Sequence, residues 1–200
     1  MVISYENPGP KISSTVFGKN VWIEPDLESL KKDTDCVMLL ANQNINEETQ
    51  KKFTDAALLI ASPGEYENGG LFTYALGHAP VSYVVLADYI SIAIPFCGKD
   101  GVETRVKEEL RSADIILFDF HERNPWGTID DATLVDVLLA MVRDIEPRVC
   151  IVVDSKAMPA ASKLLHGLGW KQPTDPVEKF KILKKDLPTE DMLVVALDRV

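Results

Sequence analysis

Short apolar runs, separated by polar or glycine-containing links, fill the first half of the chain. Runs of this length, rich in β-branched and aromatic residues, predict strands. We expect them at residues 2–6, 12–17, 21–24, 36–41, 56–61, 71–76, 81–87 and 89–96. Short helices are expected at residues 26–32, capped by Asp26, and at residues 47–53. The close succession of strands joined by tight links predicts an antiparallel arrangement for this half.

From Gly98 onward, helical patterns alternate with single strands. The clearest helix is predicted at residues 130–145, where apolar residues recur at intervals of three and four. Further helices are expected at residues 102–111 and 159–168, and strands at residues 114–120, 149–153, 180–183 and 192–197. A strand-rich first half, followed by a second half in which helices and strands alternate, predicts an α+β layered sandwich with two sheets face to face and helices outside.

One polar stretch of the first half does not fit the strand pattern. It runs from Ser62 to Gly70 and contains Pro63 and three glycines. Proline and glycine in this density are typical of a shaped turn. We therefore predict a turn in which Gly64 adopts special backbone angles and Tyr66 packs on the sandwich.

Composition narrows the class of protein. A chain of 200 residues without visible repeats or linkers predicts a single domain over residues 1–200. The net charge of −10 and the pI of about 4.8 argue against a nucleic-acid partner, because no basic surplus is available to displace phosphate counterions.

Location is also indicated by the sequence. The three cysteines lack C-x-x-C spacing, which favours a reducing compartment. No apolar run approaches the roughly 20 residues that cross a bilayer, and no signal peptide is visible. The sequence therefore predicts a cytoplasmic protein without a membrane segment.

The candidate chemistry begins in the loop after residues 36–41. Ligands and catalytic groups often lie at the carboxyl ends of buried strands, and this loop carries Asn42, Asn44, Asn46 and Glu47. Amide side chains do not titrate and cannot act as general bases. The position is thus suited to chemistry, whereas the side chains of the three asparagines are not.

The order of the segments resembles the metallo-β-lactamase superfamily, in particular small hydrolases of that fold from bacteria. The segments that carry the likeness are residues 36–47, 63–67, 81–98, 127–132 with 144–148, and 184–188. They cover almost the whole chain in the right order. The resemblance implies an αββα four-layer sandwich, which in this family binds one or two metal ions, usually zinc, at one edge.

The resemblance also identifies the positions where the family has its metal ligands. The motif His-x-His-x-Asp-His falls on Asn42, Asn44, Asn46 and Glu47, and a later family histidine falls on Asp154. The bridging aspartate falls within residues 96–99, in a register that the sequence does not fix. Only His78 stands where the family has histidine. Zinc in such sites needs imidazole or thiolate donors plus carboxylate, and one retained histidine cannot hold it, so we expect the ordinary hydrolase mechanism to be absent.

Other side chains allow two interpretations each. Glu47, Asp154 and the segment Asp119-Phe120-His121-Glu122 could bind a hard divalent ion. Alternatively, the acids of that segment are solvated rim charges, and Asp154 caps the following helix. Cys97 could be a nucleophile or a buried thiol, and Trp126 a ligand platform, a dimer contact or a lid. His78 and His166 also fit ordinary surface positions.

Two hypotheses of function follow. The first is a non-catalytic protein of this fold, without cofactor, that acts as a binding or assembly module, as a homo-oligomer or with a protein partner. The second is a metal-dependent hydrolase of the same superfamily with a rebuilt, non-standard metal site. The candidate vestigial pocket consists of Asn42, Asn44, Asn46, Glu47, His78, His121 and Asp154.

Overall fold

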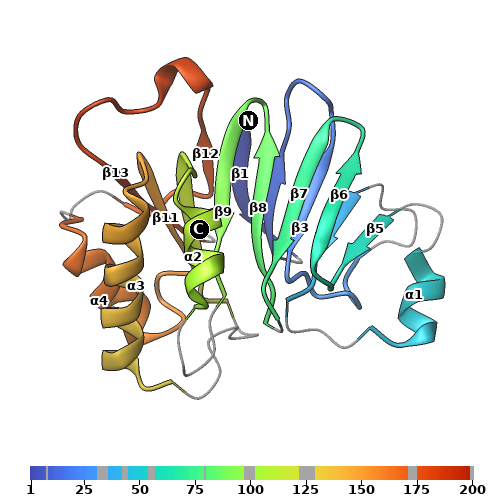
Figure 1. Cartoon of the computed structure of the whole chain (residues 1–200), viewed down its shortest axis with the longest axis horizontal. Coiled ribbons are helices and arrows are strands. Elements are labelled where there is room, and N and C mark those ends of the chain that lie inside the picture. The colour runs from blue at the N-terminus through green and yellow to red at the C-terminus, as the bar shows by residue number, and fades with distance from the viewer. Residues whose placement is uncertain are drawn as a thin grey trace.

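A computed structural model describes residues 1–7, 9–30, 36–41, 45–53, 57–78, 80–96, 102–121, 129–170 and 175–198. Two β-sheets face each other, and helices cover their outer faces (Figure 1). This arrangement confirms the predicted α+β sandwich with αββα layers. No helix in these ranges is both long enough and apolar enough to cross a membrane.

Sheet A has six strands in the order β12-β1-β2-β3-β4-β5. Their bounds are β1 Val2–Glu6, β2 Gly9–Ser13, β3 Asn20–Ile23, β4 Cys36–Leu39, β5 Ala57–Ile60 and β12 Lys179–Lys181. The strands β12, β1, β2 and β3 pair antiparallel, whereas β3, β4 and β5 run parallel. The antiparallel prediction is therefore wrong for the pairs β3–β4 and β4–β5.

Sheet B has seven strands in the order β13-β11-β10-β9-β8-β7-β6. Their bounds are β6 Gly64–Asn68, β7 Leu71–Leu76, β8 Ser82–Ala87, β9 Ile90–Ile94, β10 Ile115–Asp119, β11 Val149–Val153 and β13 Leu193–Leu197. The strands from β6 to β9 form an antiparallel meander, and β9, β10, β11 and β13 are parallel.

Helices form the outer layers. Sheet A carries α1 Glu47–Phe53, and sheet B carries α2 Thr104–Leu110, α3 Asp131–Ile145 and α4 Pro159–Gly167. The side chain of Asp130 accepts hydrogen bonds from the N–H groups of Ala132 and Thr133, which caps α3. A 3-10 turn, η1 Lys184–Asp186, precedes β13.

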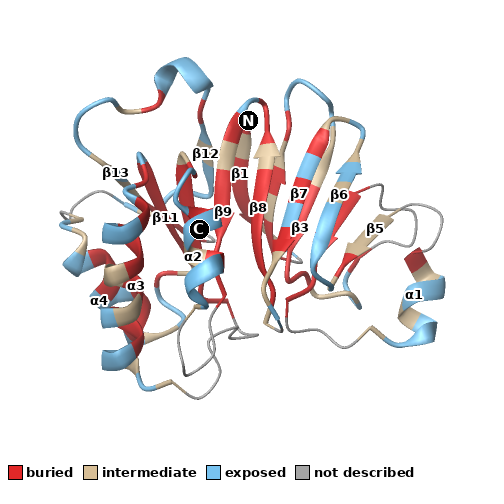
Figure 2. Cartoon of the chain, viewed as in Figure 1, coloured by how far each residue is buried: buried red, intermediate tan, exposed pale blue. Residues whose placement is uncertain are grey.

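Alternation along the strands separates the core into layers. In β10, Ile115 and Leu117 face sheet A, whereas Ile116 and Phe118 pack under the helices of sheet B. In Figure 2 the central strands of both sheets are mostly buried. The polar groups that emerge at the strand ends therefore lie at the rim of a closed apolar core.

Strand direction brings several chain segments to one edge of the sandwich. The parallel strands β9, β10, β11 and β13 all end there, and contacts described below bring the ends of β1 and β3 to the same edge. We call this the site edge. The opposite edge, with the hairpin between β8 and β9, is the far edge.

Two local predictions are wrong. Residues 64–68 form the edge strand β6 rather than a turn, because the tight turn lies at Gly69 and Gly70, where φ is 58° and 91°. Positive φ at both central residues is the requirement of a type I′ hairpin. Gly64 does have a positive φ, 156°, and Tyr66 packs against the core of the sandwich, as predicted. In the segment predicted as a helix at residues 26–32, the described residues form a turn, in which Asp26 accepts from Ser29 Oγ at 2.7 Å.

Candidate functional site

The alternation of β10 continues past its last residue and places two polar side chains between the sheets. Asp119 and His121 follow Ile115 and Leu117 at intervals of two, so they face the same side. Phe120 faces the helices instead. Asp119 is 1% exposed and His121 is 7% exposed, so the pair is buried at the site edge.

Both ring nitrogens of His121 face oxygen atoms. Nδ1 lies 2.6 Å from Oδ2 of Asp119, and Nε2 lies 3.0 Å from the backbone carbonyl oxygen of Glu24. The other carboxylate oxygen of Asp119 accepts the backbone N–H of His121 at 3.2 Å. The ring is thereby fixed between the end of β10 and the end of β3.

These contacts alter the proton affinity of the ring. Burial lowers the pKa of His121, because it disfavours the charged form. The hydrogen bond and the charge of Asp119, followed by the backbone and charge of Glu24, outweigh that effect and raise the pKa above its ordinary value. These contacts therefore stabilise the charged form of the ring more than water does.

Asp154 follows β11 and lies on the same edge. Its backbone has φ 56°, its N–H donates to the carbonyl of Leu197, and its carboxylate accepts the hydroxyl of Tyr5 at 3.0 Å. Burial raises the pKa of Asp154; the Tyr5 hydroxyl and His121 lower it, whereas Asp198 and Asp119 raise it, and the net shift is upward. Negative charge thus accumulates at this edge.

A further carboxylate, Asp198, follows β13. Its Oδ1 accepts the N–H of Ser155 at 2.6 Å, and its Oδ2 accepts the Ser155 hydroxyl at 2.7 Å. Lys156 approaches Oδ2 to 3.9 Å but is 77% exposed at its side chain. Asp198 therefore fixes the loop after β11, which includes Asp154.

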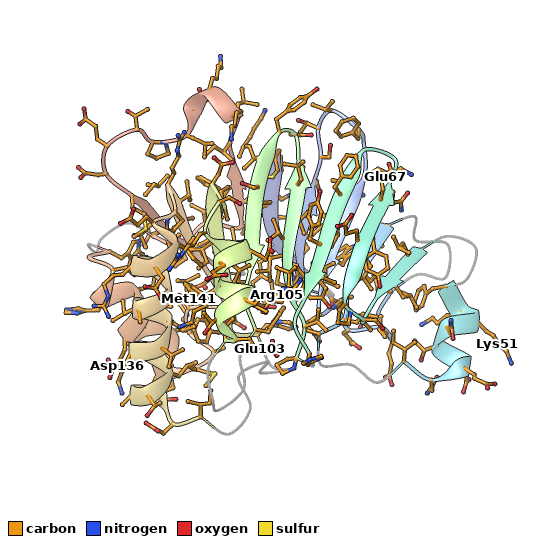
Figure 3. The ribbon with its side chains drawn as sticks, in the orientation of Figure 1. Lys51, Glu67, Glu103, Arg105, Asp136 and Met141 are labelled. Atoms are coloured by element: carbon orange, nitrogen blue, oxygen red, sulfur yellow. The ribbon has the colours of Figure 1, made fainter. Side chains whose placement is uncertain are left out.

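The structure brings together only part of the predicted pocket. His121 and Asp154 lie at the site edge, whereas Asn46 accepts the N–H of Thr49 and so caps α1. Glu47 points into solvent, 3.8 Å from Lys51. Its expected role beside Asp154 is therefore wrong, because the short helix α1 carries it away from the sheets; Figure 3 shows Lys51 on this outer helix.

The remaining predicted residues divide into two groups. His78 follows β7 and is exposed, as is His166 on α4. Asn42, Asn44, Cys97 and Trp126 lie outside the described residues. The helix-capping interpretation of Asp154 is wrong, since residue Met158 occupies the N-cap position of α4 and Asp154 binds Tyr5 instead.

Three residues of the cluster were absent from the predicted pocket: Tyr5, Glu24 and Asp198. Each of them stands at or just after the end of a strand, in β1, β3 and β13 respectively. The available signal was a polar residue directly after an apolar run, as in Ile23-Glu24 and Leu197-Asp198. Sequence alone could not pair them, since the pairing depends on how the two sheets face each other.

Comparison with solved structures identifies the architecture. A predicted Zn-dependent hydrolase of the metallo-β-lactamase superfamily from Thermotoga maritima superposes with a TM-score of 0.66 at 13% identity, over 100% of both chains. A variant of the β-hydroxylase CmlA gives a TM-score of 0.51 at 10% identity, over 76% of this chain and 45% of that one. The chain has the metallo-β-lactamase fold.

One more structure of this fold is similar to the chain. Zn²⁺-bound PqqB from Methylobacterium extorquens gives a TM-score of 0.46 at 13% identity, over 86% of this chain and 85% of that chain. No family model matches the sequence, and no curated protein matches it. The comparisons thus establish the fold.

The cluster does not fit the zinc ion that the metallo-β-lactamase fold implies. Zinc would need a lone pair from an imidazole nitrogen, but Nε2 of His121 faces the carbonyl oxygen of Glu24, and Nδ1 lies only 2.6 Å from Oδ2 of Asp119, which leaves no room for an ion between these two atoms. Asp154 is held by Tyr5. Within the described part of the chain, no three His, Cys, Asp or Glu side chains are grouped so that they could hold a metal ion.

Proposed function

We propose that this protein is a non-catalytic binding module on a metallo-β-lactamase fold, and that its partner is a protein segment with basic residues. The observation that carries the proposal is an uncovered face at the β6 end of sheet B. On that face, exposed aromatic side chains lie beside exposed carboxylates. The side chains at the site edge, which do not fit a zinc ion, support the non-catalytic part of the proposal.

Two aromatic residues of β7 form the apolar part of this face. Phe72 is 42% exposed and Tyr74 is 38% exposed, whereas Leu71, Thr73 and Ala75, which alternate with them, are buried. In Figure 2, β6 and β7 show exposed segments toward the viewer, while α2 lies in front of β9. The described helices of sheet B thus leave these rings uncovered.

Two glutamates of β6 lie beside these rings. Glu65 is paired with Tyr74, and Glu67 with Phe72, in the antiparallel register of β6 and β7, so the side chains of each pair share a face. Figure 3 shows Glu67 on this strand. Carboxylates beside aromatic rings suit a lysine or arginine, whose charge meets the acid and whose stem packs on the ring.

The backbone of β6 offers a second means of attachment. The hairpin turn at Gly69-Gly70 makes Asn68 and Leu71 the first paired residues, and hydrogen-bonded and non-bonded pairs then alternate. The N–H and C=O groups of Glu65 and Glu67 therefore point away from β7. An extended segment can add to such an edge as a further strand.

The charges on the edge indicate which segment would bind. A second copy of β6, added antiparallel, would bring Glu65 and Glu67 against the same acidic side chains, which is unfavourable. A segment with alternating basic residues would instead be attracted, and the net charge of −10 would favour the approach of a basic partner. We therefore favour a different protein over a homo-oligomer.

The proposal is tested with a defined probe, a synthetic peptide of alternating lysine and valine, against an acidic peptide of alternating glutamate and valine. We expect the wild-type protein to bind only the basic peptide, measured by fluorescence anisotropy. The variant Glu65→Lys/Glu67→Lys should lose affinity by about tenfold or more, because two attractive charge contacts become repulsive while the rings of β7 are unchanged.

The control variant is Glu108→Lys/Glu109→Lys on α2, which changes the net charge equally on two exposed positions. It should bind the basic peptide with nearly wild-type affinity. An equal loss in both variants, or no binding by the wild-type protein, contradicts the proposed surface. Self-association of Glu65→Gln/Glu67→Gln without peptide binding by the wild type would mean that the glutamates protect the edge from aggregation.

The hydrolase hypothesis is tested on the same protein. Elemental analysis after purification without chelator should find no stoichiometric zinc, manganese or iron. A metal bound at close to one equivalent, together with a loss of stability on chelation, would favour the rebuilt hydrolase over the binding module.

A further inference from the structure

We propose that the segment that binds β6 carries a β-branched apolar residue between its two basic residues, and that Tyr66, with Leu58 on the facing sheet, selects this residue. The inference rests on the proposed function, because it concerns the same added strand. It adds a surface on the inner side of the sheet to the acidic surface on the outer side. The partner is then recognised by a pattern, basic–apolar–basic, rather than by charge alone.

The outer strands of the two sheets, β5 and β6, lie on the same side of the sandwich (Figure 1). In β6, Tyr66 packs against the core between the sheets, whereas Glu65 and Glu67 on either side of it are exposed. In β5, Leu58 packs against the same core, whereas Leu59 packs on the opposite face, toward α1. Tyr66 and Leu58 are only half-buried. Both sheets thus end in an inner apolar side chain that is covered in part.

Contacts across the sandwich place Leu58 and Tyr66 at the same level. The hydroxyl of Tyr83 on β8 donates to the carbonyl of Ile60 at 3.0 Å, so these two residues face each other. A step of two residues away from the site edge leads in β5 from Ile60 to Leu58. The same step in sheet B leads to the row in which Thr73 pairs with Tyr66. Leu58 therefore lies opposite the row that ends in Tyr66.

The geometry of an added strand explains the selection. The backbone groups of Glu65 and Glu67 point away from β7 and would bond an antiparallel segment, so the residue opposite Tyr66 falls in a non-hydrogen-bonded pair. In such pairs the Cα atoms are only about 4.5 Å apart, and the side chains contact each other closely. An aromatic residue opposite a β-branched residue is a favourable cross-strand pair. Valine or isoleucine therefore fits between the two basic residues.

The inner side of the added strand would not tolerate a third basic residue. The acids that attract the segment, Glu65 and Glu67, lie on the outer side of sheet B, because Tyr66 between them faces the core. A charge on the inner side would lose water without gaining a carboxylate from this strand, which is unfavourable. An apolar residue would instead cover exposed parts of Tyr66 and Leu58, which is favourable.

The first test compares two peptides of equal charge, one of alternating lysine and valine and one of alternating lysine and threonine. Threonine has nearly the shape of valine and also favours strands, but it carries a hydroxyl in place of a methyl group. We expect the wild-type protein to bind the lysine–valine peptide about tenfold more tightly in fluorescence anisotropy.

The second test removes the inner contact. Tyr66→Thr and Leu58→Asn should each reduce the preference for the lysine–valine peptide to less than about threefold. The matched control is Leu59→Asn, which changes the next residue of β5, also half-buried but on the face toward α1. It should keep the preference near tenfold. A preference that survives in both Tyr66→Thr and Leu58→Asn overturns the inference; circular dichroism establishes that each variant is folded.

Methyl NMR of the wild-type protein tests the same contact without substitution, and so decides the matter should a variant fail to fold. Saturation with the lysine–valine peptide should shift the methyl resonances of Leu58 and leave those of Leu59 nearly unchanged. Shifts at Leu59 but not at Leu58, or at neither residue, overturn the inference.

The outcomes separate this inference from the proposed function. Equal affinity of the wild type for both peptides, lost in Glu65→Lys/Glu67→Lys, would support the acidic surface and overturn selection of the apolar residue. No binding of either peptide would contradict the β6 surface itself, and the inference with it.

Discussion

The two edges of the sandwich bury carboxylates in different ways. At the far edge, Asp88 accepts hydrogen bonds from Ser14 Oγ at 2.5 Å and from the N–H and hydroxyl of Thr15 at 2.8 Å each, and the Met1 ammonium lies 2.9 Å away. At the site edge, Asp119 depends on His121, and Asp154 has the hydroxyl of Tyr5. One edge supplies more donors than its acid needs, whereas the other collects acids.

The proton affinities follow the same division. Burial alone would raise the pKa of Asp88, but the hydrogen bonds from Ser14, the Met1 ammonium and Thr15 outweigh burial and hold the pKa well below its usual value. The pKa of Asp154 is raised instead. The comparison teaches that the far edge stabilises the ionised form of Asp88, whereas the site edge disfavours the ionised form of Asp154.

The largest effect is expected at the far edge. Asp88→Asn replaces an acceptor by an amide whose NH₂ faces the donors of Ser14 and Thr15, so we expect a loss of about 3–4 kcal/mol in the free energy of unfolding. Urea titration at pH 7 measures it. Exposed Asp136→Asn on α3, labelled in Figure 3, should change stability by less than about 0.5 kcal/mol.

This prediction carries a pH dependence. The pKa of Asp88 is lowered in the folded state, so its contribution is present above the unfolded pKa of about 4 and is lost as pH falls below that value. The difference between wild type and Asp88→Asn should therefore shrink in acid. A stability difference that stays constant down to the pKa of Asp88 in the folded state would contradict a role for the ionised carboxylate.

The second-largest effect on stability is expected at the site edge, where the pH dependence has the opposite sign. His121→Gln should lose about 2 kcal/mol at pH 6. Because the folded pKa of His121 is raised, its contribution is full below the unfolded pKa of about 6.5 and is lost as pH rises through the folded pKa. The stability difference between wild type and variant should thus decrease toward alkaline pH, where a flat difference would contradict a charged ring.

A smaller effect is expected at Asp154. Asp154→Asn keeps an oxygen that accepts the Tyr5 hydroxyl and removes a charge near Asp119 and Asp198. We expect a stability at pH 7 that is equal to wild type or higher by less than about 1 kcal/mol. A clear loss in urea titration would show that the charge of Asp154 is needed, and would weaken the contrast between the edges.

The smallest effect on stability is expected on the β6 surface. Glu65→Lys/Glu67→Lys changes exposed side chains and removes the hydrogen bond that Glu67 Oε1 accepts from the N–H of Gly70 at 2.8 Å, so its free energy of unfolding should fall by only about 0.5 kcal/mol. Circular dichroism during thermal unfolding measures this. A large loss would mean that reduced peptide binding by this variant reflects damage to the fold.

Much of the fold could be predicted from the sequence because its apolar patterns are local. Val2–Glu6, Leu71–Leu76 and Val149–Val153 are strands over the predicted residues, and α1 has its predicted bounds. The strand β6 was missed because its own residues, Glu65 and Glu67, are polar and exposed. An edge strand with one solvated face has no apolar run to reveal it.

The site was less predictable, for a physical reason. His121 and Asp154 could be named because they follow apolar runs on neighbouring strands. The contacts that define their chemistry, from Glu24 and Tyr5, come from the other sheet. Periodicity within one strand says which way a side chain points, but it does not say what stands opposite.

The path of the last segment has a consequence for the folding process. After α4 the chain adds β12 to the rim of sheet A, beside β1, and then crosses to add β13 to the rim of sheet B. The pairing of Val2 with Lys181 joins residues that lie far apart in the sequence. Both sheets therefore gain an outer strand only when segments far apart in the sequence meet, which favours slow folding.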